Sequence, residues 1–142
     1  MDLTEYDYRA LAEFRYQLRH FLQFSERRAR DHGIEPQQHQ ALLALKGLPA
    51  GTRPTIGELA NRLALRHHTT VELINRLELA GFVKRQQDRV DGRQILIRLT
   101  PQAAAKLRAL SLAHRDELQV KGPALAKALR GILRGSQEFH AA

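Results

Sequence analysis

The segment from residue 55 to residue 100 constrains the fold most, because its hydrophobic pattern changes period along its length. Apolar residues recur at spacings of three and four, as on one face of a helix, over 56–64 and again over 67–80. Short runs with the β-branched character of strands follow at 82–85 and 94–99. The segment is therefore predicted to form two helices joined by a tight turn, followed by a two-stranded hairpin.

Capping and turn residues fall at the expected boundaries of these elements. Thr55 and Glu58 have the T-x-x-E spacing of a capping box, which marks the start of the first helix. Gly81 is placed to end the second helix, and Gly33 to end a helix over 4–31, where a residue of positive φ is often needed. The Asp91-Gly92 pair between the two strands is a hairpin signal.

The flanking stretches are also predicted to be helical. Apolar residues keep helical spacing over 4–31, and a short helix is expected over 36–46. After the hairpin, a helix is expected over 101–119, followed by a break at a Gly-Pro pair and a last short helix over 124–133. The fold class is therefore mainly α with a small β-hairpin, an α+β arrangement.

The charge of the chain favours a polyanionic partner. Lys and Arg total 23 against 15 Asp and Glu, which gives a formal net charge of +8 and a pI near 10.6. Residues 53–98 contain nine basic and five acidic side chains, whereas residues 1–35 contain six and seven. Charge alone is a weak signal, because many soluble basic proteins bind no specific polyanion.

Composition and motifs exclude several classes of protein. The absence of cysteine excludes disulfides, a thiol nucleophile and cysteine-based zinc sites. The seven histidines lack H-x-x-x-H or H-E-x-x-H spacing, so no metal and no other cofactor is expected. No G-x-S-x-G or P-loop motif occurs, so no catalytic residue is assigned and the chain is not expected to be an enzyme. The polar N-terminus and the lack of a long apolar run predict a cytoplasmic protein with no membrane partner.

Two helices, a turn and a hairpin in this order are typical of a winged helix-turn-helix, whose commonest partner is double-stranded DNA. The helix over 67–80 has one face predicted to point inward, formed by Thr70, Leu73, Ile74 and Leu77. Its opposite face carries polar groups suited to base edges in a major groove, and its N-terminus offers a dipole to phosphate. The residues expected to contact DNA from this helix are Arg66, His67, His68, Thr69, Val71, Glu72, Asn75 and Arg76.

The predicted hairpin forms the wing. A short two-stranded ribbon gains little stability by itself, so Arg85, Arg89 and Arg93 on it are expected to be neutralised by phosphates or a narrow minor groove. Asp91, two residues before Arg93, is expected to pair with it and to aim it. Such a pair contributes only ~0–1 kcal/mol on an exposed surface.

Several segments together resemble the MarR family of bacterial winged-helix transcriptional regulators. They are PQQHQALLAL, TIGELANRLAL, LINRLELAGFVKR, the wing tip Asp91-Gly92-Arg93 and the strand end ILIRLT. The D-x-R wing followed by a strand ending in Leu-Thr is the specific part of the match. The resemblance covers nearly the whole chain.

The resemblance implies an architecture and a mode of action. The chain is expected to form a single MarR-like domain over 1–142, with dimerisation helices at 4–35 and 101–134 and a winged-helix DNA-binding lobe at 36–99. The family forms homodimers that bind half-sites of a pseudo-palindromic operator, most often as repressors. Many members release DNA when a small aromatic or phenolic ligand binds.

The chain also departs from the family pattern. Glu72 stands where members often carry Arg or Lys, and an acidic residue there either repels phosphate or accepts a hydrogen bond from cytosine. Ala103 replaces a frequent Gly, and the absence of cysteine excludes a peroxide-sensing thiol. Glu72 keeps an alternative open: a winged-helix module that binds protein and has no specific operator.

The first helix is unusually aromatic. Six of the eight aromatic residues lie within the first 24 positions: Tyr6, Tyr8, Phe14, Tyr16, Phe21 and Phe24. They cannot share one narrow stripe, so we expect some to pack on a second subunit or to line a cavity. Tyr16, His20 and His39 are the residues expected to bind a small aromatic ligand, if the chain has one.

Overall fold

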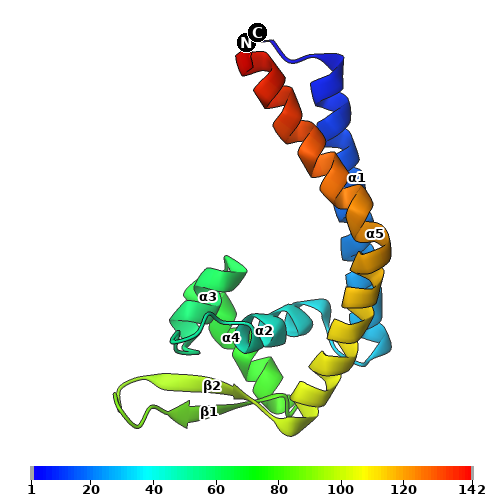
Figure 1. Cartoon of the computed structure of the whole chain (residues 1–142). Coiled ribbons are helices and arrows are strands. Elements are labelled where there is room, and N and C mark those ends of the chain that lie inside the picture. The colour runs from blue at the N-terminus through cyan, green and yellow to red at the C-terminus, as the bar shows by residue number, and fades with distance from the viewer. Residues whose placement is uncertain (1, 142) are drawn as a thin grey trace. The chain divides into compact units, whose positions relative to one another are not determined.

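The computed structural model describes residues 2–141, and the side chains of residues 2–134. The elements follow the chain in the order α1 (Glu5–Asp31), α2 (Pro36–Lys46), α3 (Ile56–Leu63), α4 (His67–Leu79), β1 (Val83–Gln87), β2 (Ile95–Leu99) and α5 (Pro101–Ala141) (Figure 1). The two strands pair antiparallel. The predicted fold class, mainly helical with one small hairpin, is confirmed.

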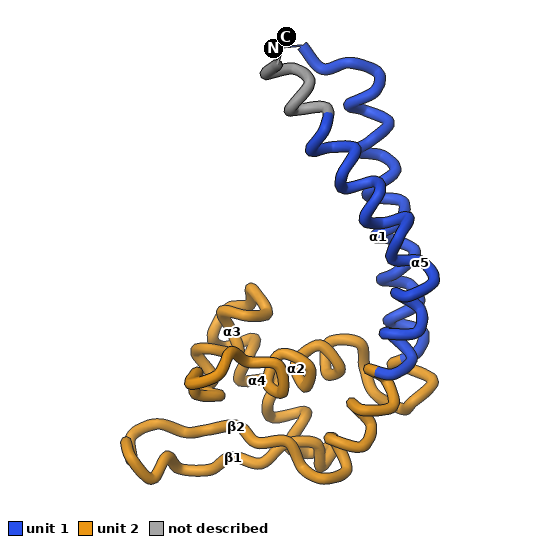
Figure 2. Tube along the Cα trace, viewed as in Figure 1, with its two compact units in different colours: residues 1–28, 112–142 blue, residues 29–111 orange. Residues whose placement is uncertain are grey.

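The chain divides into two compact units (Figure 2). The first combines residues 1–28 and 112–142, which are the outer parts of the two long helices α1 and α5. The second, residues 29–111, contains α2 to β2 and the inner ends of the long helices. We call the first the helical unit and the second the winged-helix unit.

One apolar core holds the winged-helix unit together. Its fully buried side chains include Leu42 on α2, Leu59 on α3, Leu73 and Leu77 on α4 and Ile97 on β2. Burying each such side chain stabilises the fold by ~1.5–3 kcal/mol relative to leaving it exposed. The core therefore fixes the three helices and the hairpin against one another.

Glycines end α1 and α4 as the sequence predicts. Gly81 has a φ of 79°, and its N–H donates to Glu78 O at 3.0 Å while Phe82 N–H donates to Leu77 O at 2.9 Å. Gly33, with a φ of 71°, occupies the same position after α1. These bonds satisfy carbonyls left without helical partners, and glycine adopts the left-handed backbone without a Cβ clash. The turn after α3 uses Ala64 in this conformation instead, at a φ of 54°.

The capping box predicted before α3 is only half formed. Thr55 Oγ1 accepts a hydrogen bond from Glu58 N–H at 3.1 Å, as expected. The Glu58 carboxylate does not return to Thr55 but accepts from Arg62 Nε at 3.1 Å, one helical turn further on. The Thr55 N–H donates to Arg53 O at 2.9 Å. An i, i+4 partner of opposite charge has therefore replaced the backbone as the partner of Glu58.

The predicted hairpin is present, and a loop connects its strands. The strands pair in register from Val83 with Leu99 to Gln87 with Ile95, so seven residues, 88–94, connect them and the Asp91-Gly92 pair lies within this loop. Asp88 N–H donates to Gln94 O at 2.9 Å, and Asp88 Oδ1 accepts from Val90 N–H at 2.9 Å. Hydrogen bonds from short polar side chains thus stabilise a wider loop.

A segment before α3 adds to the hairpin, which the sequence did not predict. Thr55 forms an isolated antiparallel bridge with Leu96, and Ile97 N–H donates to Pro54 O at 2.8 Å. The wing is therefore attached along one edge to the loop that precedes α3.

The predicted break at Gly122-Pro123 is wrong, because α5 runs through both residues. Contacts with α1 exist on both sides of the proline. His114 lies against Phe24, with ring centroids 5.5 Å apart, and Tyr6 Oη donates to Gly131 O at 3.2 Å. A proline removes one helical hydrogen bond, and packing on both sides keeps the two halves continuous.

Candidate nucleic-acid interface

Helix α4 presents the two faces that the sequence predicts. Thr70, Leu73, Ile74 and Leu77 are all fully buried. Thr70 is accommodated in the core because its hydroxyl donates to Arg66 O at 2.9 Å. On the opposite face His67, His68, Glu72 and Asn75 are exposed, while Thr69 and Val71 are half-buried. The polar face thus lies in solvent, backed by a rigid apolar core.

The N-terminus of α4 keeps its unsatisfied backbone donors. Arg66 occupies the N-cap position, no described side chain caps the helix, and its first turn contains no acidic residue. Backbone N–H groups and the helix dipole therefore favour an anion at this end. Arg66, His67 and His68 are exposed around it.

Arg76 is directed from α4 toward the start of α2, with 46% of its side chain exposed. Its Nη2 donates to Gln37 Oε1 at 3.3 Å, and its Nε lies 3.9 Å from Glu35 Oε2. The guanidinium thus lies at the start of α2. The sequence assigned this residue to the DNA-contacting face, and these contacts turn it toward the neighbouring helix.

Arg85 and Asn75, expected to act separately, contact each other. Arg85 Nη2 donates to Asn75 Oδ1 at 2.6 Å, and Arg85 Nη1 donates to Glu78 Oε1 at 2.6 Å. The hairpin and α4 are thus joined by a pair of hydrogen bonds from one guanidinium. Nothing in the local sequence indicates this pairing, because ten positions separate the two residues.

The tip of the wing exposes two arginines, Arg89 and Arg93, and the side chain of Arg93 is 92% exposed. Asp91 Oδ1 accepts from Arg93 N–H at 3.1 Å and from its Nε at 3.2 Å. The predicted Asp91–Arg93 pair is therefore present. It holds the guanidinium through Nε, while the side chain remains almost wholly in solvent.

An ion pair that the sequence did not indicate attaches the wing to the rest of the unit. Asp88, at the end of β1, is buried and pairs with Arg53 in the loop before α3. The same carboxylate accepts from Val90 N–H, so it connects the wing loop to that guanidinium.

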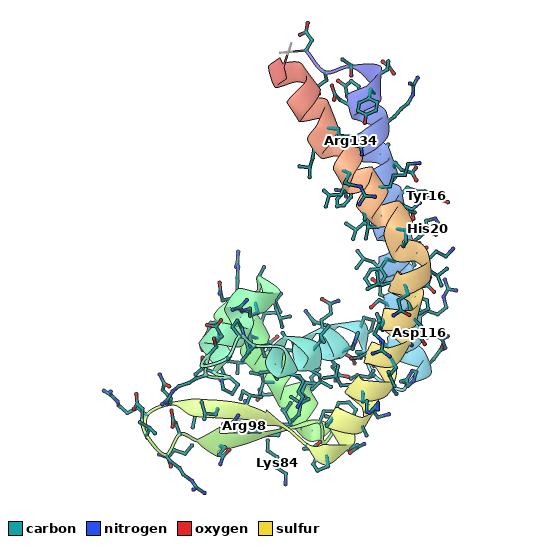
Figure 3. The ribbon with its side chains drawn as sticks, viewed as in Figure 1. Tyr16, His20, Lys84, Arg98, Asp116 and Arg134 are labelled. Carbon is teal, nitrogen blue, oxygen red and sulfur yellow. The ribbon has the colours of Figure 1, made fainter. Side chains whose placement is uncertain are left out.

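Two basic residues outside the predicted site lie opposite each other on the hairpin. Lys84 on β1 pairs in register with Arg98 on β2, and both are exposed (Figure 3). Like charges at directly opposed positions destabilise a hairpin. This strand pair adds positive charge to the wing at some cost in stability.

In the helical unit, Tyr16 and His20 lie one turn apart on α1, with ring centroids 4.4 Å apart (Figure 3). Both line a cavity of about 400 Å³ between α1 and α5, whose other lining residues include Phe21, Glu117 and Lys121. His39, the third residue expected to bind a ligand, does not line it. It is buried within the winged-helix unit, on α2.

Two further observations concern metals and membranes. Among the described residues, no three His, Cys, Asp or Glu side chains gather where they could hold a metal ion. Within the same part of the chain, no helix combines the length and the apolar character needed to span a bilayer.

Comparison with known proteins agrees with this geometry. The sequence model of the MarR family matches residues 32–94. No curated protein matches the chain. The solved structure of AbsC, a MarR family transcriptional regulator from Streptomyces coelicolor, is 17% identical, with a TM-score of 0.73 over 100% of this chain and 99% of that one.

Two other structures match over almost their whole length. A MarR family protein from Bacillus stearothermophilus is 25% identical, with a TM-score of 0.65 over 99% of this chain and 97% of that one. The S. aureus MepR–DNA complex is 18% identical, with a TM-score of 0.67 over 99% and 98%.

The fold and the exposed face of α4 define a winged helix-turn-helix protein. The family model over residues 32–94 and the shared fold make the chain similar to the DNA-binding transcriptional regulators of the MarR family. The resemblance inferred from the sequence is confirmed. Proteins of this family are transcriptional regulators, which agrees with the expectation that the chain is not an enzyme.

Proposed function

We propose that the protein binds a pseudo-palindromic operator as a homodimer and represses transcription from it. The observation that carries this proposal is the exposed polar face of α4, with an uncapped N-terminus, in the same compact unit as the exposed arginines of the wing. The MepR–DNA complex, a structure of the same fold, supports it. Repression is the commoner mode in the family.

The proposed contacts divide between two elements. Helix α4 lies in the major groove and reads bases or binds backbone through Arg66, His67, His68, Thr69, Val71, Glu72 and Asn75, with Arg76 beside it. In the wing, Arg89 and Arg93 bind phosphates or a minor groove, Asp91 aims Arg93, and Arg85 supports the α4 face.

Exposed apolar side chains on the helical unit support the homodimer. On α1, Tyr6, Tyr8, Leu11, Tyr16 and Leu22 are all more than 40% exposed, and Val120, Leu129 and Leu133 on α5 are exposed as well. Apolar surface of this extent, gathered on two helices, is characteristic of an interaction surface. A second copy of the chain would cover it and would also present two α4 helices to two half-sites.

Selection from a random pool of DNA duplexes tests the operator and the dimer together. We expect an enriched inverted repeat whose affinity falls steeply as salt rises, because several phosphate contacts release counterions. A selected pool without a motif, bound only weakly and non-specifically, would contradict the proposal. It would favour the alternative of a protein-interaction module, in which Glu72 repels phosphate.

We also propose that a small aromatic acid binds the helical unit and weakens DNA binding. The cavity beside Tyr16 and His20 supports this, because it combines aromatic walls with the ammonium of Lys121, which a carboxylate could meet. Thermal-shift measurements with salicylate and related phenolic acids test the idea. We expect a concentration-dependent rise in Tm, and the absence of a rise with every acid would count against it.

A further inference from the structure

Arg85 differs from the other arginines of the wing in what it contacts. It lies in the middle of β1, with its side chain only 30% exposed, whereas that of Arg93 is 92% exposed. Both terminal nitrogens of its guanidinium are engaged at 2.6 Å, one by Glu78 Oε1 and the other by Asn75 Oδ1. Glu78 and Asn75 are three residues apart on α4, so they lie on one side of the helix.

We propose that Arg85 is a positioning residue, which orients the Asn75 amide for base recognition and does not hold a phosphate. This inference rests on the proposed function, because it assumes that α4 reads bases. It assigns Arg85 a part in sequence specificity, whereas Arg89 and Arg93 contribute affinity for any duplex.

The contacts of Arg85 argue against a phosphate partner. The Glu78 carboxylate already neutralises its charge at short distance. A guanidinium is a planar fork with fixed donor directions, and here two of those directions are occupied by α4. A phosphate would have to use the three remaining N–H donors, and it would meet a guanidinium whose charge the Glu78 carboxylate already offsets.

The same contacts determine which way the Asn75 amide faces. Arginine can only donate hydrogen bonds, so the atom that meets Arg85 Nη2 has to be the amide oxygen. The amide nitrogen is the other branch of the side chain, and none of the described residues accepts a hydrogen bond from it. Asn75 is exposed, and it therefore offers N–H donors outward.

This orientation predicts what kind of base Asn75 recognises. Outward donors match base atoms that accept hydrogen bonds in the major groove, such as guanine N7 and O6 or thymine O4. An asparagine without this restraint could turn its oxygen outward and accept from adenine or cytosine amino groups. Arg85 thus selects one of the two orientations of the amide.

The test compares four variants on the selected operator and on its single-base substitutions, across a salt series. They are Arg85→Ala, Arg85→Lys, Asn75→Ala and the double variant Arg85→Ala/Asn75→Ala, with Arg93→Ala as the matched charge-loss control. Arg85→Lys keeps the positive charge and removes the fork. Circular dichroism and thermal denaturation establish that each variant is folded before its binding is measured.

We expect Arg85→Ala and Arg85→Lys to lose discrimination at the same base pair as Asn75→Ala, on the order of tenfold. The salt dependence of binding should stay that of the unchanged protein, and the double variant should discriminate no worse than Asn75→Ala alone. Arg93→Ala should instead weaken binding to all sequences and lower the salt slope by about one.

Two results would overturn the inference. One is a salt slope lowered by about one in Arg85→Ala and restored in Arg85→Lys, which identifies a phosphate contact. The other is unchanged discrimination at every base pair in Asn75→Ala. Failure of the proposed function has a different signature, since Arg93→Ala and Asn75→Ala would then both leave DNA binding unaltered.

Discussion

Replacing Asp88 with alanine is expected to lower the free energy of unfolding by about 1.5–3 kcal/mol, as for loss of hydrogen bonds to a buried charged group. The variant loses the ion pair with Arg53 and the acceptor of Val90 N–H together. It also leaves that backbone donor without its protein partner. Denaturation by urea, followed by circular dichroism, measures the effect.

Asp91→Ala is the matched control, because it removes the same group from the same loop. Its partner Arg93 is almost fully exposed, so its loss should change stability by at most ~1 kcal/mol. A loss of stability in Asp88→Ala no greater than that in Asp91→Ala would show that the pair with Arg53 does not stabilise the wing.

Replacing Arg93 with alanine is expected to weaken DNA binding by about 1–3 kcal/mol if the side chain enters a groove. Its guanidinium is exposed at the tip of the wing, and Asp91 holds it through Nε, so little ordering is needed on binding. Part of the loss should appear on every DNA sequence, with a smaller salt slope. Titration of labelled duplexes at several salt concentrations measures both quantities.

Arg108→Ala provides the comparison for Arg93→Ala. It removes one positive charge from an exposed position on α5, outside the proposed contacts. Its effect should be small and confined to low salt, where charges act over longer distances. Equal affinity of Arg93→Ala and the unchanged protein at near-physiological salt would remove the wing tip from the mechanism.

Features that depend on neighbouring residues were predictable from the sequence. The buried face of α4 follows from apolar spacing, and Thr70 fits it because its hydroxyl bonds within its own helix. Gly33 and Gly81 end helices because each can adopt a positive φ. The Asp91–Arg93 pair also formed as predicted, since only one residue separates the two.

The predictions that proved wrong concern local signals with competing partners. Glu58 met Arg62 on its own helix instead of the backbone of Thr55. The Gly-Pro pair at 122–123 suggested a break, and α5 continues because contacts with α1 hold it on both sides. In each case a contact from outside the local pattern contributed more than the pattern itself.

The amino-acid sequence was sufficient for the order of the elements, the exposed face of α4 and the resemblance to the MarR family, because these follow from periodicity and short motifs. The partners of Arg53, Arg76 and Arg85 were not predictable. A long arginine side chain can reach many acceptors, and the one it meets depends on how the core orients helix and hairpin. Packing of the core therefore decided which arginines extend freely into solvent, where DNA can reach them, and which pair with other side chains of the protein.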